Sequence, residues 1–187
     1  ELFMQYGIRS VSMDDIATAL GMSKKTIYQY FADKDELVEA VIDDTLDENR
    51  TFCVQQKQQA KDPVHEIYLA IETMQEMLQN MNPAVLYDME KFHPRAYNKF
   101  QQFQYNFLYE ILTDNSERGK VEGIYREDIN TDIVVKARLE NMLLAFNQQL
   151  FPKTKYKLVD VEVQLTEHFL FGLASQKGHK LISKYQH

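Results

Sequence analysis

Four polar side chains of the kinds that bind the edges of nucleic-acid bases lie within six residues of one another, at Lys24, Lys25, Thr26 and Gln29. Lysine donates hydrogen bonds to guanine O6 and N7, glutamine forms a two-bond pair with adenine, and threonine bonds a base or contacts a thymine methyl group. All four side chains point outward if this segment is helical and Ile27 and Tyr30 face a core. The segment then has the chemistry to recognise DNA bases, provided that a larger element presents it to the major groove.

The surrounding residues, 12–31, have the pattern of two short helices joined by a tight turn. Ser12 and Ser23 each stand one residue before a helical pattern, where a serine hydroxyl caps free backbone N–H groups. Gly21 falls where the first helix must end in a left-handed residue, which glycine adopts without steric penalty. The apolar residues spaced to pack the two helices together are Ile16, Leu20, Met22, Ile27 and Tyr30. We therefore predict a helix-turn-helix, whose second helix enters the major groove of DNA.

Beyond this unit, Asp33 and Glu36 form a capping-box pattern that predicts the start of a longer helix. Residues 1–40 resemble the N-terminal domain of TetR-family transcriptional regulators. The motifs that carry the resemblance are Tyr6-Gly7, Ser12–Ala17, Ser23–Tyr28, Tyr30-Phe31 and Lys34–Leu37. In the rest of the chain the resemblance is one of layout, including a connector at Gly123–Ile129. It also implies a first helix longer than residues 1–6, so we expect that helix to be incomplete in this sequence.

The resemblance implies that the four polar residues contact bases or nearby phosphates and that Tyr28 and Lys34 contact phosphates. The hydroxyls of Ser12 and Thr26 suit phosphate contacts at helix N-termini. Tyr30 occupies the family's usual aromatic position, where we expect core packing first and DNA contact second. The expected DNA-binding residues are Ser12, Ser23, Lys24, Lys25, Thr26, Tyr28, Gln29, Tyr30 and Lys34.

After Asp33 almost every segment has helical periodicity, so we predict an all-α fold. Residues 1–40 would form a three-helix helix-turn-helix domain, and residues 41–187 a helical bundle for ligand sensing and dimerisation. Helices are expected to start at Asp33, Pro63, Pro83 and Pro94, because these positions combine a cap or a proline with an apolar stripe. The stretch 116–130 is expected to be a loop. It would be followed by a nearly all-apolar helix to Leu150 and a last helix over about 158–175.

One helix-turn-helix makes too small an interface for useful specificity, which favours two copies related by a two-fold axis on a palindromic operator. In the family the last two long helices pack as a four-helix bundle between subunits. We expect the following residues to divide between that interface and the core, with the alternative that all are core: Val135, Leu139, Met142, Phe146, Leu165, Phe169 and Leu173.

Methionine and aromatic residues are frequent in the middle helices, and such side chains suit either a helical core or an adaptable apolar pocket. The resemblance implies that some of them line a cavity for a small, largely apolar or aromatic effector. The candidates are Tyr68, Met74, Met77, Met81, Tyr87, Met89, Phe92, Phe100, Phe103 and Phe107. Family habit favours a repressor that the effector releases from DNA. The helix after Asp33 is expected to move and to change the spacing of the two DNA-binding domains.

The formal net charge of −7 argues against nucleic acid at face value. However, residues 23–34 carry three lysines and one aspartate, a local charge of +2, and most acidic residues lie elsewhere. No apolar run approaches the ~20 residues of a membrane span, and no signal peptide is visible. The single cysteine, Cys53, suits a reducing compartment, so we expect a cytoplasmic protein with no membrane partner.

The sequence offers little for an enzyme. The five histidines are scattered, and no metal-ligand motif, glycine-rich phosphate loop or nucleophile elbow is present. We therefore expect no catalysis, no cofactor and no metal. The remaining alternative is a helical dimeric interaction module that does not bind specific DNA sequences.

Overall fold

The computed structural model describes residues 1–186, and every regular element in that range is helical, which confirms the predicted all-α class. The elements are α1 (Leu2–Tyr6), α2 (Met13–Ala19), α3 (Lys24–Ile27), α4 (Lys34–Gln59), α5 (Pro63–Leu78), α6 (Ala84–Phe92), α7 (Pro94–Gln102), the π-helix η1 (Phe103–Leu108), α8 (Tyr109–Val121), α9 (Thr131–Leu144), α10 (Leu158–Leu173) and α11 (Gln176–Tyr185). No helix of this described range is long and apolar enough to cross a membrane.

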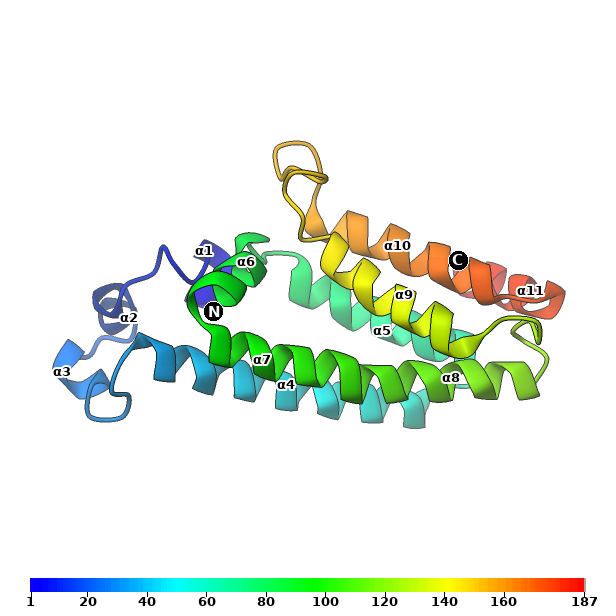
Figure 1. The fold of residues 1–187 in the computed structure, drawn as a ribbon, viewed down its shortest axis with the longest axis horizontal. Coiled ribbons are helices and arrows are strands. Elements are labelled where there is room, and N and C mark those ends of the chain that lie inside the picture. Colours follow the sequence, from blue (N-terminus) through cyan, green and yellow to red (C-terminus); the bar gives the residue numbers. More distant parts are fainter. Residues whose placement is uncertain (187) are drawn as a thin grey trace.

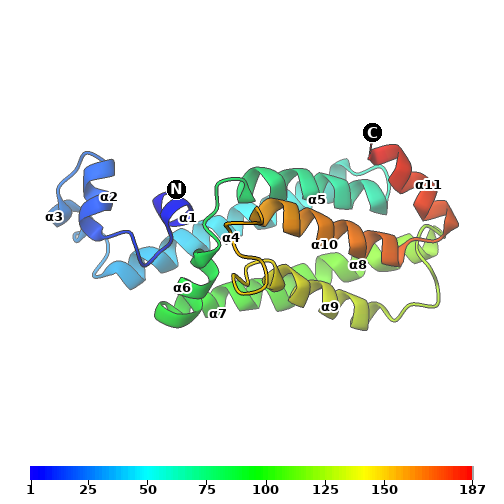
Figure 2. The ribbon, with the colours of Figure 1, turned by 90° about the horizontal axis from the view of Figure 1, so that it is seen from above.

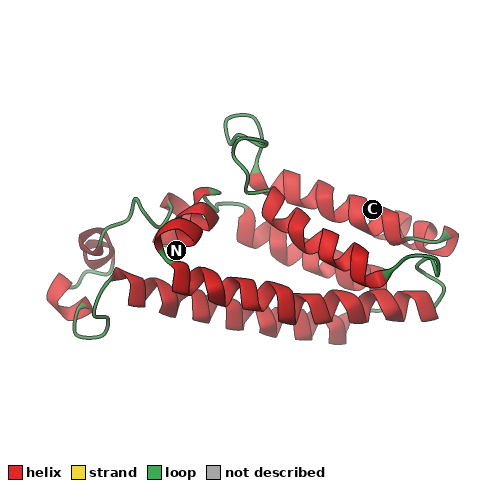
Figure 3. Ribbon diagram, in the orientation of Figure 1, coloured by secondary structure: helices red, strands yellow, loops and turns green. Residues whose placement is uncertain are grey.

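Two long rods run along the molecule, α4 and the continuous α7–η1–α8 (Figure 1). Helices α1 to α3 lie at one end of α4, and α11 lies at the opposite end of the molecule. Seen from above, α5, α10 and α9 run along the rods, with α10 beside both α5 and α9 (Figure 2). A long loop joins α9 to α10 and projects from the bundle (Figure 3).

The helix starts follow from local sequence. Asp33, Asp62 and Asn130 each accept a hydrogen bond from the backbone N–H three residues on, which satisfies a donor that the first turn leaves free. Pro63 and Pro94 occupy first-turn positions, where a missing N–H costs nothing. The predicted starts near Asp33, Pro63, Pro83 and Pro94 are confirmed.

Two other predicted boundaries are wrong, and one helix was not predicted. Helix α8 continues to Val121, so the loop begins later than residue 116, and α9 ends at Leu144 rather than Leu150. The chain also forms α11, which the sequence analysis did not predict. Helix α8 persists because Asn115, Ser116 and Gly119 are buried against the connector that follows it, a contact invisible to local periodicity.

Gly119 is the point of closest approach between α8 and that connector. A Cβ built on it would overlap the ring of Tyr125, whose hydroxyl donates a 3.0 Å hydrogen bond to Asn115 Oδ1. We expect Gly119→Ala to lower the free energy of unfolding by about 1–3 kcal/mol, because overpacking forces a buried ring to move.

Urea denaturation would measure this change, and Gln55→Ala is the control. Gln55 is also helical but is exposed, so its replacement by alanine should be neutral or slightly stabilising. Equal stability of the two variants would contradict the packing account.

The largest apolar cluster joins the N-terminal helices to the bundle. Phe3, Ile8, Ile16 and Ile27 belong to the same buried cluster as Val38 and Met89, among others. A second cluster lies between α5, α10, α11 and the connector, and a third lies where α5, α9 and α10 meet. The first cluster contains residues from both sides of position 40. The N-terminal helices and the bundle therefore share one packed core, and a movement of one affects the packing of the other.

Candidate nucleic-acid interface and internal cavity

The two helices of the predicted helix-turn-helix are capped as expected. The Asp15 N–H donates to Ser12 Oγ at 3.1 Å and the Ser12 N–H donates to Asp15 Oδ2 at 2.8 Å, which completes a capping box. These hydrogen bonds from Ser12 lower the pKa of the Asp15 carboxyl. Gly21 has a φ of 65°, and Ser23 Oγ accepts from the Thr26 N–H at 3.1 Å. The predicted caps and left-handed turn residue are confirmed.

Two of the five residues predicted to pack the helices together do so. Ile16 and Ile27 are buried, whereas Leu20, Met22 and Tyr30 are 60%, 42% and 75% exposed. The core prediction for these three residues is wrong. Helix α3 has only four residues, so helical spacing extrapolated past Ile27 no longer describes the direction of Tyr30. Leu20 and Met22 lie beyond the last residue of α2, at its C-cap and in the turn, where helical spacing no longer applies either. Residues that sequence reasoning did not include, among them Phe3 and Ile8, complete the core.

Four residues at and after α3 form an exposed surface, which we call the recognition face: Lys25, Tyr28, Gln29 and Tyr30. Within residues 1–186, the side chains of Lys25 and Gln29 have no hydrogen bond or ion pair. Both are therefore available to an external partner.

The other expected DNA-binding residues already have intramolecular contacts. Lys24 Nζ pairs with Asp14 Oδ2 at 2.8 Å, and the hydroxyls of Ser23 and Thr26 lie 2.8 Å apart in a hydrogen bond. The Ser12 hydroxyl donates to Asp15 Oδ2 at 2.6 Å. These contacts are solvent-exposed, so they would compete only weakly with a phosphate.

Lys34 has a structural contact that its sequence position did not indicate. Its Nζ donates to the Ile8 carbonyl oxygen at 2.6 Å and lies 5.8 Å from the centre of the Phe3 ring. Partial burial lowers the pKa of its ammonium group. The side chain thus ties the segment after α1 to the start of α4.

Helices α1 to α3, which we call the head, are attached to α6 as well as to α4. The Arg9 N–H donates to Asp88 Oδ2 at 2.9 Å, and the Asn82 N–H donates to the Met4 carbonyl oxygen at 2.7 Å. Two hydrogen bonds, one to the Asp88 side chain of α6 and one from the backbone just before α6, therefore link this helix to the segments around α1.

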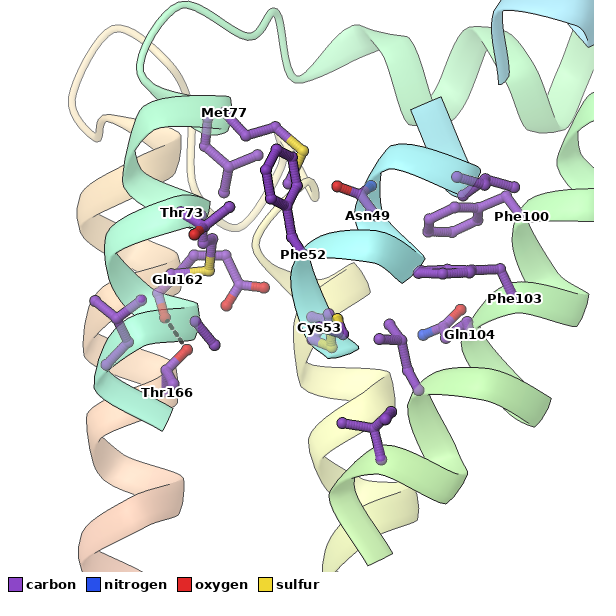
Figure 4. A pocket seen from close by; sticks show the side chains of 18 of the residues that line it. Asn49, Phe52, Cys53, Thr73, Met77, Phe100, Phe103, Gln104, Glu162 and Thr166 are labelled. Carbon is purple, nitrogen blue, oxygen red and sulfur yellow. Dashed lines mark hydrogen bonds between the residues drawn. The ribbon is translucent and has the colours of Figure 1, made fainter. Parts of the chain in front are cut away.

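A cavity of about 290 Å³ lies inside the bundle and is lined by helices α4 to α10. Met4 of α1 also lines it. Its walls are mostly apolar. Six of the ten residues proposed for ligand binding line it: Met74, Met77, Met81, Met89, Phe100 and Phe103. Phe52 and Met77 are partly exposed while lining the cavity, so they mark its opening between α4 and α5 (Figure 4).

The other four candidates do not line this cavity. Tyr87 and Phe92 are exposed and pack edge to face, and Tyr68 lies against the ring of Tyr185. Phe107 stacks on Phe103, with the Arg50 guanidinium 4.8 Å from its ring centre. Periodicity identified these residues as apolar but did not indicate which interior or surface each would face.

Sequence reasoning missed the polar residues of the cavity. Arg138 Nη1 donates to Glu162 Oε2 at 3.3 Å, and its Nη2 donates to Thr166 Oγ1 at 2.7 Å. All three residues are buried, and Figure 4 shows Glu162 and Thr166 on the α10 wall. Burial raises the pKa of Glu162 to about 7, although Arg138 opposes the shift. The sequence did contain one signal for this site, because Arg138 is a charged residue at a core-facing position of the mostly apolar helix α9.

Cys53 also lines the cavity, on the α4 side. Burial raises the pKa of its thiol to about 11, so the thiolate is scarce at neutral pH. This agrees with a packing role for the residue.

All seven residues proposed for the dimer interface contact the interior of their own protomer. Val135, Leu139 and Leu173 are buried in it, and Met142, Phe146 and Phe169 line the cavity. Leu165 packs against the third cluster. Val135, Leu139 and Leu173 therefore lie on the core side of the expected division between core and subunit interface.

The outer surface of α9 and α10 consists of other residues, and α9 is not apolar all round. Ile133 is 63% exposed and Phe171 is 38% exposed, and the small residues Ala137 and Gly172 are also exposed. We call these four residues the α9–α10 outer face.

Comparison with known proteins gives consistent matches. Residues 1–41 match the model for "Bacterial regulatory proteins, tetR family". The chain is 22% identical over 175 residues to an uncharacterised HTH-type transcriptional regulator, YvaF, of Bacillus subtilis, covering 90% of this chain and 88% of that protein.

Two solved structures have the same fold. A TetR-family regulator from Agrobacterium tumefaciens superimposes with a TM-score of 0.76 at 16% identity, covering 93% and 92% of the two chains. The regulator FadR from Bacillus subtilis, solved in complex with stearoyl-CoA, superimposes with a TM-score of 0.64 at 15% identity, covering 92% and 94%.

Proposed function

Because the chain is a transcriptional regulator of the TetR family and not an enzyme, we propose that it is a repressor released from its operator by a small apolar effector. The observation that carries the proposal is the position of the cavity. Its walls include residues of α4 and α6, the two helices that hold the head, and Met4 of the head itself. Filling the cavity therefore acts directly on the groups that orient α3.

The recognition face supplies the contacts to DNA. Lys25 and Gln29 have the chemistry to recognise bases, and Tyr28 and Tyr30 present exposed hydroxyls beside them that can reach phosphates. The local charge of +2 over residues 23–34 attracts DNA, while the acidic bundle is repelled from it. Residues 1–40 thus act as the DNA-binding domain, and residues 41–187 as the sensing and dimerisation domain.

The chain acts as a homodimer on a palindromic operator, with the α9–α10 outer face at the two-fold axis. Ile133 and Phe171 offer apolar area there, and the exposed Ala137 and Gly172 allow helices to approach closely. Half-site centres are then one DNA turn (~34 Å) or a multiple of it apart.

The effector acts by binding one spacing of the two heads better than the other. The cavity is the natural place for it, because its apolar wall is continuous from the opening at Phe52 to Met89 beneath the head. That FadR of the same fold was solved with stearoyl-CoA supports an apolar ligand for such a bundle.

Selection from random duplex DNA, followed by fluorescence anisotropy across a range of salt concentrations, tests the proposal. We expect an enriched palindrome, bound by a dimer, with an affinity that falls steeply as salt rises. A helical interaction module without specific DNA binding would enrich no sequence at low salt. A monomer in sedimentation equilibrium at micromolar concentration would contradict the dimer.

A further inference from the structure

The rod formed by α7 and α8 is interrupted by the π-helix η1, over Phe103–Leu108. A π-helical segment inserts extra chain into an α-helix, weakens its regular hydrogen bonding and recurs at functional sites. Here the segment faces α9 and the cavity, and it places Phe103 and Gln104 in the wall. Phe103 and Gln104 are both buried.

Gln104 has an unsatisfied acceptor. Its Nε2 donates to the Leu139 carbonyl oxygen at 2.7 Å, which fixes the orientation of the amide and leaves Oε1 without a partner. The residue is 1% exposed, so bulk water does not supply the missing donor. Figure 4 shows the side chain pointing from η1 into the space that Asn49 and Cys53 line from α4. An acceptor buried without a donor is costly, and native proteins retain one mainly where a ligand or water completes it.

The other buried polar groups of the cavity are paired, whereas Asn49 lines it half-buried, without a hydrogen bond to another residue of the described range. Gln56 Nε2 donates to Thr73 Oγ1 at 2.7 Å, and Arg138 is shared between Glu162 and Thr166. Glu66 is bound by Arg118. Three buried side-chain oxygens lack a partner within residues 1–186, and only Gln104 Oε1 belongs to a residue that lines the cavity.

We propose that Gln104 determines effector specificity by accepting a hydrogen bond, so that the effector is an uncharged, compact, largely apolar molecule with one hydroxyl or N–H donor. This inference rests on the proposed function, since it assigns the effector class of that cavity. The apolar walls bind the body of the molecule, and the buried free acceptor selects its polar end.

Charged effectors fit this cavity less well. A carboxylate has no proton to donate to Gln104 Oε1, and Arg138, the cation in the same wall, is already paired with Glu162. An ammonium group could donate to Gln104, but Glu162 is already paired with Arg138, so the cost of burying the ammonium charge would not be offset. A neutral donor satisfies Gln104 without disturbing either partner of this pair.

Three probes of similar size separate these chemistries: 1-decanol, which has a hydroxyl donor, methyl nonyl ether, which accepts only, and decanoate, which is anionic. Isothermal titration calorimetry at pH 8, without DNA, would compare their binding to the full chain. We expect 1-decanol to bind about 10-fold more tightly than the ether, as one neutral hydrogen bond allows, and decanoate to bind more weakly than 1-decanol.

The decisive variant is Gln104→Leu, and Gln102→Leu is its matched control on the exposed side of α7. In Gln104→Leu the preference for the alcohol should vanish while the ether still binds, which also shows that the cavity has formed. In Gln102→Leu the preference should persist.

Equal binding of the alcohol and the ether would overturn the inference, as would a preference that survives in Gln104→Leu, tightest binding of decanoate, or no binding of any probe. Because the assay contains no DNA, its result is independent of operator selection. If selection enriches an operator but the donor preference is absent, only the proposed effector class is rejected. If the donor preference is found but selection enriches no operator, only the proposed repressor function is rejected.

Discussion

Lys25→Ala will weaken binding of the selected operator by about 2–6 kcal/mol per dimer, because each lost base contact costs about 1–3 kcal/mol and a two-fold dimer loses it twice. The Lys25 ammonium is exposed and has no intramolecular partner within residues 1–186, so its whole donor capacity is available to DNA. The variant should also relax the sequence preference at one base pair in each half-site. Fluorescence anisotropy with the operator and with single-base variants of it measures both effects.

Lys180→Ala is the control for this prediction. It removes the same charge from an exposed position on α11, at the opposite end of the molecule from α3, so operator affinity should stay nearly unchanged. Tyr28→Phe should weaken binding to all sequences alike, as expected for a phosphate contact. Unchanged affinity and specificity in Lys25→Ala would rule out this face as the recognition surface.

Arg138→Met will lower the free energy of unfolding by about 3–5 kcal/mol at pH 8, because it leaves a buried carboxylate without its cation. Arg138 and Glu162 are 5% and 3% exposed, so water compensates for neither charge. Urea denaturation measures the loss. The double variant Arg138→Met with Glu162→Leu removes both charges and should recover most of the stability. If the double variant is as unstable as the single one, packing rather than the unpaired charge explains the loss.

The same carboxyl group gives the wild-type protein a pH dependence of definite sign. Burial raises the pKa of Glu162 from 4.5 to about 7, so the folded chain keeps a proton that the unfolded chain has already lost. Stability from this group is therefore highest at low pH and falls as pH rises from 4.5 to about 7, by about 3 kcal/mol relative to Glu162→Gln. Above pH 7 the difference between the two proteins should stay constant. A wild-type protein that instead gains stability relative to Glu162→Gln between pH 4.5 and 7 would contradict this assignment.

Predictions that depend on neighbouring residues in the chain succeeded. Ser12, Gly21 and Ser23 act within three or four residues of themselves, since a cap or a left-handed turn is satisfied by the adjacent backbone. The same holds for Asp33, Pro63 and Pro94, whose helix starts were predicted close to where they occur. The motif of residues 12–31 also sufficed to indicate the family.

The direction that a side chain faces was less predictable. Leu20, Met22 and Tyr30 have the composition of a core but lie on the surface, because they stand beyond the ends of two short helices and the core is completed by α1. Tyr87 and Phe92 likewise pack on the surface rather than in the cavity. Apolar character is a property of the residue, whereas burial depends on which helices pack against it.

The sequence by itself determined where most helices begin, that the fold is all-α, and which segment has the chemistry to contact bases. Tertiary structure alone decided the cavity and its polar contacts. Gln104 meets Leu139 across 35 residues and Arg138 meets Glu162 across 24, so neither partnership leaves a periodic signal. Local hydrogen bonds and sterics act over a few residues and are written into neighbouring positions. A buried polar group, by contrast, depends on contacts that exist only once distant helices have packed together.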